Sequence, residues 1–382
     1  MAQISVPFLD LKQINAPYMD ELREAAADVV ESGWYIRGNF CEQFEKAFAA
    51  YCGVKFGVGV GNGLDALSLM LKSEIELGRL RAGDEILVPA NTYIATVLAV
   101  SAAGLVPVLV EPDEKSFNID PNRLVSACTE RTRGILVVHL YGRLASMKSI
   151  CDFAKSRGLL VFEDCAQAHG ARCAFGGNAD AVAGSFGAAA AYSFYPTKNL
   201  GALGDAGMVV TNDAELARVV RALANYGSER KYVNLYRGVN SRLDEMQAAL
   251  LLKKLPHLDA WNARRREIAA RYLNEIRNPL IGLPGAPANP LEHVWHVFTV
   301  RLQSENARDA LQKYLEGRGV GTLVFYPIPP HLQKAYGTEL GNPGDFPIAE
   351  NLAKTVISIP MNQVLTDEQV TQVVEALNEF SC

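Results

Sequence analysis

The sequence GVGVGNGLDALSLMLKSEIEL at residues 57–77 decides the fold class. It begins with Gly57–Val60, a short apolar run that predicts a buried β-strand. Residues 61–63 read Gly-Asn-Gly, which indicates a turn. Residues 65–77 then carry apolar side chains at three- and four-residue spacing, which predicts an amphipathic helix. A strand that leads directly into a helix is the repeating unit of α/β proteins with a largely parallel sheet.

The same alternation continues on the C-terminal side of this stretch. The further predicted strands are Glu85–Val88, Val106–Val110, Gly134–His139, Leu159–Glu163, Ala189–Ser193 and Met208–Thr211. The helices predicted between and after them are Tyr93–Ala103, Met147–Ser156 and Ala214–Ala224. Together they predict an α/β core of roughly 200 residues or more, which is within the usual size of one domain.

The last third of the chain has a different order of predicted helices and strands. A long helical stretch, 241–276, is interrupted at Pro256. After it we expect a strand at Val297–Leu302, a helix at Glu305–Gly317, a strand near Thr322–Phe325 and a final helix at Asp367–Phe380. This order predicts a smaller α+β domain, so we divide the chain into a large domain at 1–255 and a small C-terminal domain at 256–382.

Composition excludes several classes of protein. The 382 residues include 37 basic and 42 acidic side chains, a net charge of −5, and no run of like charges, so we expect no nucleic-acid partner. No apolar run reaches about 18 residues, and we expect a cytoplasmic protein with no membrane contact. The seven cysteines contain no C-x-x-C pair and predict neither a disulfide framework nor a metal site.

Two features lie where an α/β sheet binds its ligand, beyond the C-terminal ends of strands. At Gly61–Gly63 the chain turns into a helix, so the amides of Leu64 and Asp65 are expected to face an anion, although an ordinary βα turn is the better explanation of this segment taken alone. Asp164 follows the apolar strand residues 158–162. A carboxylate there requires a positive partner, or else it caps a helix.

The third feature is the segment SFYPTKNLG at residues 193–201, which contains Lys198. It follows an alanine-rich strand and precedes Gly204-Asp205-Ala206-Gly207. Desolvation in such a loop lowers the pKa of a lysine and makes its amine nucleophilic. The alternative is a solvated surface lysine, but the surroundings are apolar and rich in glycine.

The three features together predict a site for pyridoxal 5'-phosphate. This cofactor requires an anion cradle for its phosphate, a carboxylate at its pyridine nitrogen and a lysine that forms a Schiff base. Residues 61–65 with Ser193 supply the first, Asp164 the second and Lys198 the third. A nicotinamide-binding site would instead require G-x-G-x-x-G, and the segment 59–64 lacks the last glycine.

These motifs resemble the DegT/DnrJ/EryC1/StrS sugar aminotransferases. The resemblance extends over essentially the whole chain, with matching segments at residues 7–11, 91–93, 163–167, 193–207, 239–244 and 326–329. It implies a fold type I pyridoxal-phosphate enzyme, an α/β protein whose large domain has a mostly parallel central sheet and whose smaller C-terminal domain is α+β. Related dehydratases carry histidine in place of the lysine, so Lys198 favours an aminotransferase.

The resemblance also implies roles for individual residues. Lys198 corresponds to the catalytic Schiff-base lysine, Asp164 to the catalytic carboxylate on the pyridine nitrogen, and Gln167 to a side chain near the ring oxygen of the cofactor. Ser193 corresponds to a hydroxyl on the phosphate, which Gly63, Leu64 and Asp65 would also contact. Tyr93 corresponds to an aromatic ring stacked on the pyridine, with core packing as the alternative.

Other matching positions concern the partner subunit and the substrate. Asn240 corresponds to a residue that reaches the phosphate of the neighbouring subunit, so we expect a homodimer with shared active sites. Tyr326, His331 and His296 resemble residues near the substrate; a rigid Pro-rich turn and a pair of aromatic residues at a strand edge are the alternatives. Arg143 departs from the glutamine common in the family, and we interpret it as a determinant of sugar or donor preference.

Within the family the sequence most resembles the transaminases of dTDP-3-oxo-6-deoxyhexoses. The resemblance implies amination of a dTDP-linked 3-oxo-6-deoxyhexose to the 3-amino-3,6-dideoxyhexose, with glutamate as the donor. The assignment of C3 rests on analogy alone. A 4-aminotransferase or a UDP-sugar aminotransferase of the same fold is the alternative.

Overall fold

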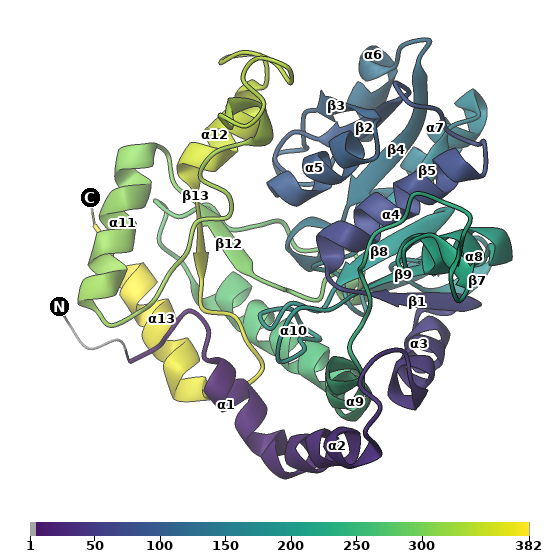
Figure 1. Ribbon diagram of the computed structural model, residues 1–382. Coiled ribbons are helices and arrows are strands. Elements are labelled where there is room, and N and C mark those ends of the chain that lie inside the picture. Colours follow the sequence, from purple (N-terminus) through teal and green to yellow (C-terminus); the bar gives the residue numbers. More distant parts are fainter. Residues whose placement is uncertain (1–4, 382) are drawn as a thin grey trace.

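The computed structural model describes residues 5–381, which form an α/β unit and a smaller C-terminal unit (Figure 1). The α/β unit contains a seven-stranded sheet with the strand order β1-β9-β8-β5-β4-β2-β3. Its strands are β1 Phe56–Val60, β2 Glu85–Pro89, β3 Val106–Val110, β4 Thr132–Val138, β5 Leu160–Asp164, β8 Ala189–Ser193 and β9 Gly207–Thr211. Each agrees with a predicted strand to within two residues at both ends. Only β9 is antiparallel to its neighbours, so the predicted mostly parallel sheet is confirmed.

Helices cover both faces of this sheet because successive strand residues point to opposite sides. In β2, Leu87 packs into one apolar cluster, whereas Ile86 and Val88 pack into the other. The first cluster includes side chains of α3 Asn39–Cys52 and α7 Met147–Arg157. The second includes side chains of α4 Gly63–Glu76, α5 Ile94–Ala102 and α8 Ala214–Leu223. A short helix, α6 Leu124–Ala127, follows β3.

The predicted helical stretch 241–276 divides at its proline. Helix α9 spans Glu245–Lys254, a 3-10 turn spans Leu255–His257, and α10 spans Leu258–Glu275. The ring of Pro256 removes a backbone donor, which explains the interruption. Helix α10 leads from the α/β unit into the C-terminal unit, as Figure 1 shows.

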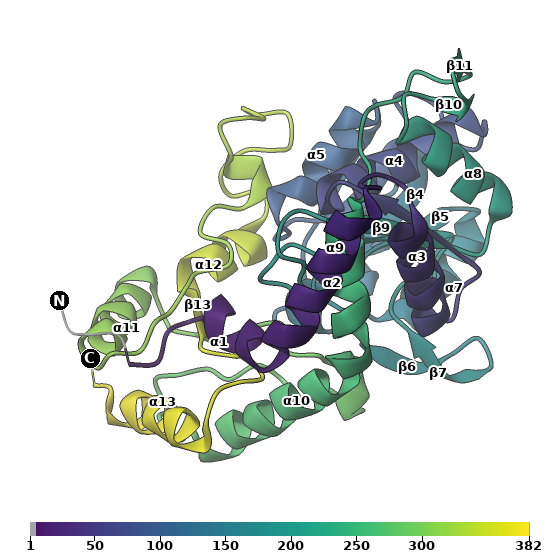
Figure 2. The same cartoon turned by 60° about the horizontal axis from the view of Figure 1, so that its bottom comes forward.

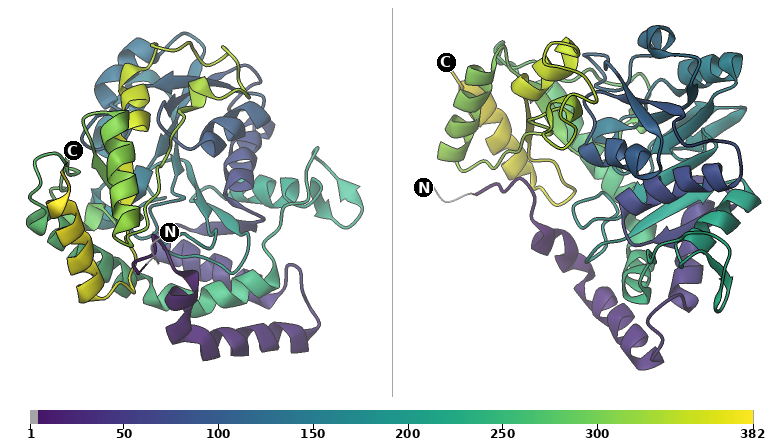
Figure 3. Two further views of the ribbon diagram at one scale, coloured as in Figure 1. Left: turned by 90° about the vertical axis from the view of Figure 1, so that its left-hand side faces the viewer. Right: turned by 45° about the horizontal axis from the view of Figure 1, so that its top comes forward.

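The N-terminal helices are α1 Leu11–Asn15 and α2 Met19–Ser32. Helix α2 packs beside α9 (Figure 2) and buries Leu22, Ala25 and Val29 against it. In the right-hand view of Figure 3 these purple helices extend away from the rest of the molecule. Val6 belongs to the core cluster of the C-terminal unit and bridges to Val320, so residues of the first predicted domain contact the second.

The C-terminal unit contains one small antiparallel sheet. Strand β12 Phe298–Arg301 pairs with β13 Val356–Ile359, and the helices are α11 Glu305–Gly317, α12 Pro347–Thr355 and α13 Asp367–Glu379. The strand predicted near Thr322–Phe325 is wrong, because only Leu323 makes an isolated bridge, to Ser358. The fully buried run of β13 occupies the position beside β12 instead, and Leu323 is 46% exposed. Neither α12 nor β13 was among the predicted elements.

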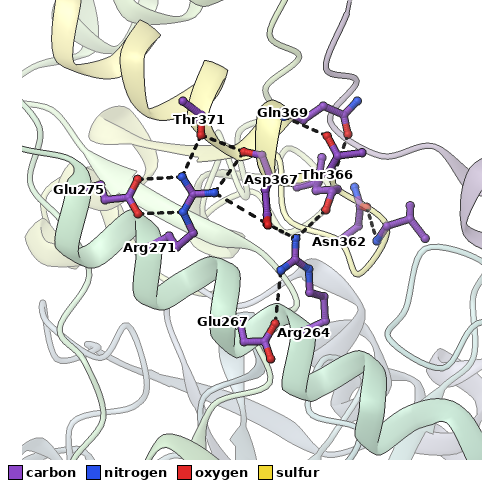
Figure 4. A network of polar contacts seen from close by, with 11 residues as sticks. Arg264, Glu267, Arg271, Glu275, Asn362, Thr366, Asp367, Gln369 and Thr371 are labelled. Carbon is purple, nitrogen blue, oxygen red and sulfur yellow. Dashed lines mark hydrogen bonds and ion pairs between the residues drawn. The ribbon is translucent and has the colours of Figure 1, made fainter.

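A polar network joins α10 to the start of α13 (Figure 4). Arg264 contacts Asp367 at 2.7 Å, and Arg271 forms a bidentate pair with Glu275. Thr366 caps α13. Exposed ion pairs of this kind contribute little individually, so the apolar cluster beneath them supplies most of the stability of the unit.

Two small hairpins complete the fold. Strands β6 Arg172–Phe175 and β7 Asn178–Val182 form one, and β10 Ser228–Arg230 and β11 Val233–Asn234 form the other. The second hairpin projects at the edge of the molecule beyond α8 (Figure 2). Within residues 5–381, no helix is long and apolar enough to cross a bilayer.

Candidate active site

A cavity of about 540 Å³ lies beyond the C-terminal ends of the parallel strands. It contains most of the residues predicted for the cofactor: Gly63, Leu64, Tyr93, Asp164, Gln167, Ser193 and Lys198 all line it, as does Tyr326. These residues come from five separate segments of the chain. The expected position of the site, at the edge of the sheet where the parallel strands end, agrees with this geometry.

Lys198 lies in the turn after β8, where its backbone amide donates to the carbonyl of Tyr195 at 2.8 Å. Burial of its amine in the cavity lowers the pKa of Lys198 to about 8, and the nearby Asp164 carboxylate opposes that shift. A larger fraction of this amine is therefore neutral near pH 8 than for a surface lysine. The alternative of a solvated surface lysine does not fit this environment.

Asp164 is the last residue of β5 and is almost fully buried. Its Oδ2 accepts a hydrogen bond from the Thr96 hydroxyl at 2.9 Å, and its Oδ1 accepts one from the amide of Ala166 at 3.1 Å. Burial raises the pKa of Asp164, whereas these two donors and the positive charge of Lys198 lower it. The carboxylate is thus held in one orientation at the cavity wall.

Gly63 allows two loops to approach closely. A Cβ atom at Gly63 would lie 2.6 Å from the Cβ of Ser193, so only glycine fits where helix α4 begins beside the end of β8. The first-turn amides of Gly63 and Leu64 have no partner within the helix. With the Ser193 hydroxyl they form a concave group of donors, which is the chemistry required to hold a phosphate.

Asp65 does not contribute to this cradle, contrary to the expectation from the sequence. The amide of Asp65 donates to Oδ1 of Asn62 at 2.9 Å, because Asn62 is the N-cap of α4. The Asp65 carboxylate accepts from the Ser241 hydroxyl at 2.6 Å. Asp65 therefore orients the turn from outside the cavity, and the anion donors begin at Gly63.

Aromatic side chains form one wall of the cavity. The Tyr93 ring is 53% exposed and its centroid lies 5.0 Å from that of Tyr326, so core packing does not account for Tyr93. Gln167 donates to the Tyr326 hydroxyl at 2.9 Å and accepts from the amide of Tyr141 at 2.6 Å. Gln167 thus positions Tyr326, which belongs to the segment after α11.

Four other predicted residues lie outside the cavity wall. His331 is buried, and its Nε2 lies 3.0 Å from Glu350, so it joins two segments of the C-terminal unit. His296 is partly buried and contacts Asn199, the residue after Lys198. Asn240 is exposed and lies on a surface loop. Arg143 donates to the carbonyl of Gly285 and does not reach the cavity, so its predicted effect on sugar preference gains no support.

Residues that the sequence reasoning missed also support the site. Asn199 contacts α10 and the segment before β12, and Thr96 contacts Asp164. The only signal for them in the sequence was position: Asn199 directly follows Lys198, and Thr96 lies three residues after Tyr93 in the predicted helix. Glu163 accepts from three backbone amides, at Gly184, Phe186 and Gly187, and so holds the chain before β8.

Comparison with known proteins identifies the family. A family model for the DegT/DnrJ/EryC1/StrS aminotransferase family matches residues 18–378. The chain belongs to this family. The aminotransferase is 52% identical to a dTDP-3-amino-3,6-dideoxy-alpha-D-galactopyranose transaminase of Aneurinibacillus thermoaerophilus, over 98% of this chain and 99% of the relative. It is 47% identical to a dTDP-3-amino-3,4,6-trideoxy-alpha-D-glucose transaminase of Streptomyces venezuelae, over 98% and 96%.

Solved structures agree with this assignment. The crystal structure of S. venezuelae DesV in complex with a ketimine intermediate matches the aminotransferase with a TM-score of 0.91 and 47% identity, over 98% of both chains. The structure of ntda from Bacillus subtilis with bound cofactor pmp matches with a TM-score of 0.88 and 30% identity, over 99% of this chain and 85% of that one. The predicted fold type and family are therefore confirmed.

Proposed function

We propose that this aminotransferase uses pyridoxal 5'-phosphate to convert a dTDP-linked 3-oxo-6-deoxyhexose into the 3-amino-3,6-dideoxyhexose, with glutamate as the amino donor. The observation that carries the proposal is the position of Lys198 and Asp164 in one cavity that Gly63 and Leu64, at the start of α4, also line. The names of relatives that are 52% and 47% identical supply the sugar and the nucleotide.

The cavity residues fit the cofactor. A phosphate requires several N–H or O–H donors, and Gly63, Leu64 and Ser193 offer them at a point where a Cβ atom would fill the space. A protonated pyridine nitrogen requires a carboxylate, and Asp164 is the acidic residue held rigidly in the wall. The aldehyde group of the cofactor requires an amine for its attachment to the enzyme, and Lys198 offers one with a lowered pKa.

When bound, pyridoxal phosphate supplies an electron sink for the charge that develops next to the reacting nitrogen. Lys198 would hold the cofactor through its amine and would hold and move a proton at Nζ. Its lowered pKa suits this work, because a general base is most effective when its pKa lies near the working pH.

Other side chains orient and enclose the reactants. Asp164 presents its negative charge to the ring nitrogen and favours the protonated form of that nitrogen. Tyr93 offers a flat ring to the cofactor, and Tyr326, fixed by Gln167, limits the access of water on the same side. Gly63, Leu64 and Ser193 would hold the phosphate in the cavity that Lys198 also lines.

We also propose a homodimer with shared active sites in which Asn240 reaches the phosphate of the neighbouring subunit. Asn240 is exposed, and large apolar side chains near it in sequence, such as Leu235 and Val239, are 56% and 40% exposed. Exposed apolar surface of this kind is typical of a protein interface. The six cysteines of the described residues are free, which suits the reducing conditions of the cytoplasm, where we propose that the enzyme acts.

The substrate is tested by supplying the purified enzyme with pyridoxal phosphate, glutamate and one of three sugars. These are a dTDP-3-oxo-6-deoxyhexose, its 4-oxo isomer and a UDP-linked 3-oxo sugar, and NMR identifies the carbon that carries nitrogen in each product. We expect rapid amination of the first sugar only. Preferred amination of the 4-oxo or UDP-linked sugar would support the alternative, and Lys198→Ala, which should lose the visible absorption of the bound cofactor, is the control for the site.

A further inference from the structure

Two threonine hydroxyls lead from the cavity wall to Asp164. The hydroxyls of Thr92 and Thr96 lie 2.8 Å apart, and the Thr96 hydroxyl lies 2.9 Å from Oδ2 of Asp164. Both threonines are almost completely buried, at 2% and 1% exposure, and both line the cavity. Buried hydroxyls with this geometry form a continuous hydrogen-bonded chain rather than solvated surface groups.

The direction of this chain follows from counting protons. A threonine hydroxyl has one proton to donate, and an ionised carboxylate can only accept. Thr96 therefore donates its proton to Asp164 and has none left for Thr92. Thr92 must be the donor in the contact between the two hydroxyls, so the chain runs from Thr92 through Thr96 to Asp164.

Thr96 completes the support of the carboxylate. The amide of Ala166 donates to one oxygen of Asp164, and Thr96 donates to the other. Two donors on different oxygens fix the plane of the group, yet each oxygen keeps a lone pair for another partner. Both hydrogen bonds stabilise the charged form of Asp164, whose ionisation is otherwise unfavourable because the carboxyl group is buried.

The helix start that carries Thr96 also carries Tyr93. Tyr93 is the N-cap of α5, Thr96 lies in the first turn of the helix, and Thr92 directly precedes the cap. The amide of Thr96 donates to the carbonyl of Tyr93 at 3.1 Å, so the backbone of that turn fixes their relative position. One turn of helix therefore places both the exposed aromatic ring and the hydroxyl that contacts Asp164.

We propose that Thr96, oriented by Thr92, is a positioning residue that keeps Asp164 ionised and correctly turned toward the ring nitrogen of the cofactor. This inference rests on the proposed function, in which Asp164 contacts that nitrogen. Thr96 itself acts through Asp164. Its loss should therefore change the protonation of the ring nitrogen and leave Lys198 able to bind the cofactor.

The test uses holoenzyme loaded with pyridoxal phosphate that carries ¹⁵N in its ring, because the ¹⁵N chemical shift reports protonation of that atom directly. Thr96→Val keeps the shape and removes the hydroxyl, Thr96→Ser restores the hydroxyl, and Thr92→Val removes only the outer donor. Thr96→Ala serves as a second variant without the hydroxyl. Thermal melting establishes that each variant is folded.

We expect Thr96→Val and Thr96→Ala to keep the visible cofactor band but to shift the ¹⁵N resonance toward the unprotonated position. Their kcat should fall about 10- to 100-fold, the factor for losing one hydrogen bond to a charged group, with a smaller change in KM. Thr96→Ser should retain kcat to within about threefold, and Thr92→Val should have a smaller effect than Thr96→Val, because Thr96 still donates to Asp164.

Two results would overturn the inference. An unchanged ¹⁵N shift and kcat in folded Thr96→Val would show that Asp164 does not depend on Thr96. Equal losses in Thr92→Val and Thr96→Val would show that the bond from the Thr96 hydroxyl to Asp164 makes no contribution of its own. The proposed function fails separately, and takes the inference with it, if the wild-type enzyme shows no cofactor band or if Asp164→Asn leaves the ¹⁵N shift unchanged.

Discussion

The side-chain oxygen of Asn199 lies 3.1 Å from Nδ1 of His296, which joins the residue after Lys198 to the segment before β12. The Asn199 amide group donates to Oδ1 of Asn262 at 2.9 Å and to the carbonyl of Val294 at 3.0 Å. Burial holds the pKa of His296 far below its usual range, so its ring is neutral and Nδ1 donates to Asn199. The turn that carries Lys198 is therefore bonded to α10 and to the segment before β12.

Asn199→Ala should weaken the enzyme through this connection. The substitution leaves buried groups of Asn262 and His296 without partners, and each such group destabilises by about 1–3 kcal/mol. We expect a melting temperature several degrees lower and a kcat at least about tenfold lower, because Lys198 loses its fixed position. Asn122→Ala, at an exposed turn, is the control. Wild-type kcat in Asn199→Ala would refute a positioning role for this side chain.

Gly63→Ala tests the phosphate cradle. The added methyl group would lie 2.6 Å from the Cβ of Ser193 and must push the start of α4 away from β8. We expect the dissociation constant of pyridoxal phosphate, measured by absorbance titration, to rise at least about tenfold, a loss of about 1.4 kcal/mol. Gly317→Ala, where a Cβ atom would meet nothing within 4 Å, should bind the cofactor normally. Equal affinity in both variants would argue against the cradle.

The lowered pKa of Lys198 should appear in the stability of the cofactor-free protein. Its pKa is about 8 in the folded state and 10.5 in the reference state, so between these values the unfolded chain binds more protons and the lysine favours folding increasingly as pH rises. The contribution is fully present above about pH 10.5 and is lost as pH falls through about 8.

The free energies of unfolding of the wild type and of Lys198→Met, measured by denaturation, should therefore differ by an amount that depends on pH. The free energy of unfolding of the wild type relative to the variant should rise by about 3 kcal/mol in total across this window. Lys253→Met, which replaces a partly exposed lysine whose amine lies 3.4 Å from Glu24, should show no comparable trend. A difference that stays constant with pH would contradict the assigned desolvation of Lys198.

Hybrid dimers test the role of Asn240. If Asn240 completes the site of the neighbouring subunit, the Lys198→Ala and Asn240→Ala chains are each inactive alone, but a dimer of one of each contains one intact site. Unfolding and refolding the two together should restore up to about a quarter of wild-type activity, because random pairing makes half of the dimers mixed and each has one working site of two. No recovery on mixing, or a fully active monomer by light scattering, would exclude shared sites.

Much of the fold was determined by local sequence. Short apolar runs of four to six residues indicate buried strands, and segments with apolar residues three and four positions apart indicate helices. These local patterns predicted all seven strands of the main sheet. Pro256 marked the division between α9 and α10 for a similarly local reason, its missing backbone donor. Lys198, Asp164 and Gly63 could be chosen because each follows a buried strand.

Contacts between distant segments were decided only by the tertiary structure. Residues 322–325 and 356–359 are both short apolar runs, but only the second pairs with β12. The local sequence pattern does not determine which of the two runs forms that pair. His331 carries the same polar ring wherever it lies, but packing pairs it with Glu350 away from the cavity. The amide of Asp65 does not face the cavity as expected, because it donates to the side chain of Asn62. The fold also brings the hydroxyl of Thr96 to 2.9 Å from the carboxylate of Asp164, a contact that the spacing of these residues does not predict. Hydrogen bonds between segments far apart in the chain depend on three-dimensional packing, which is why spacing predicted residues that line the cavity but not the side chains that contact them.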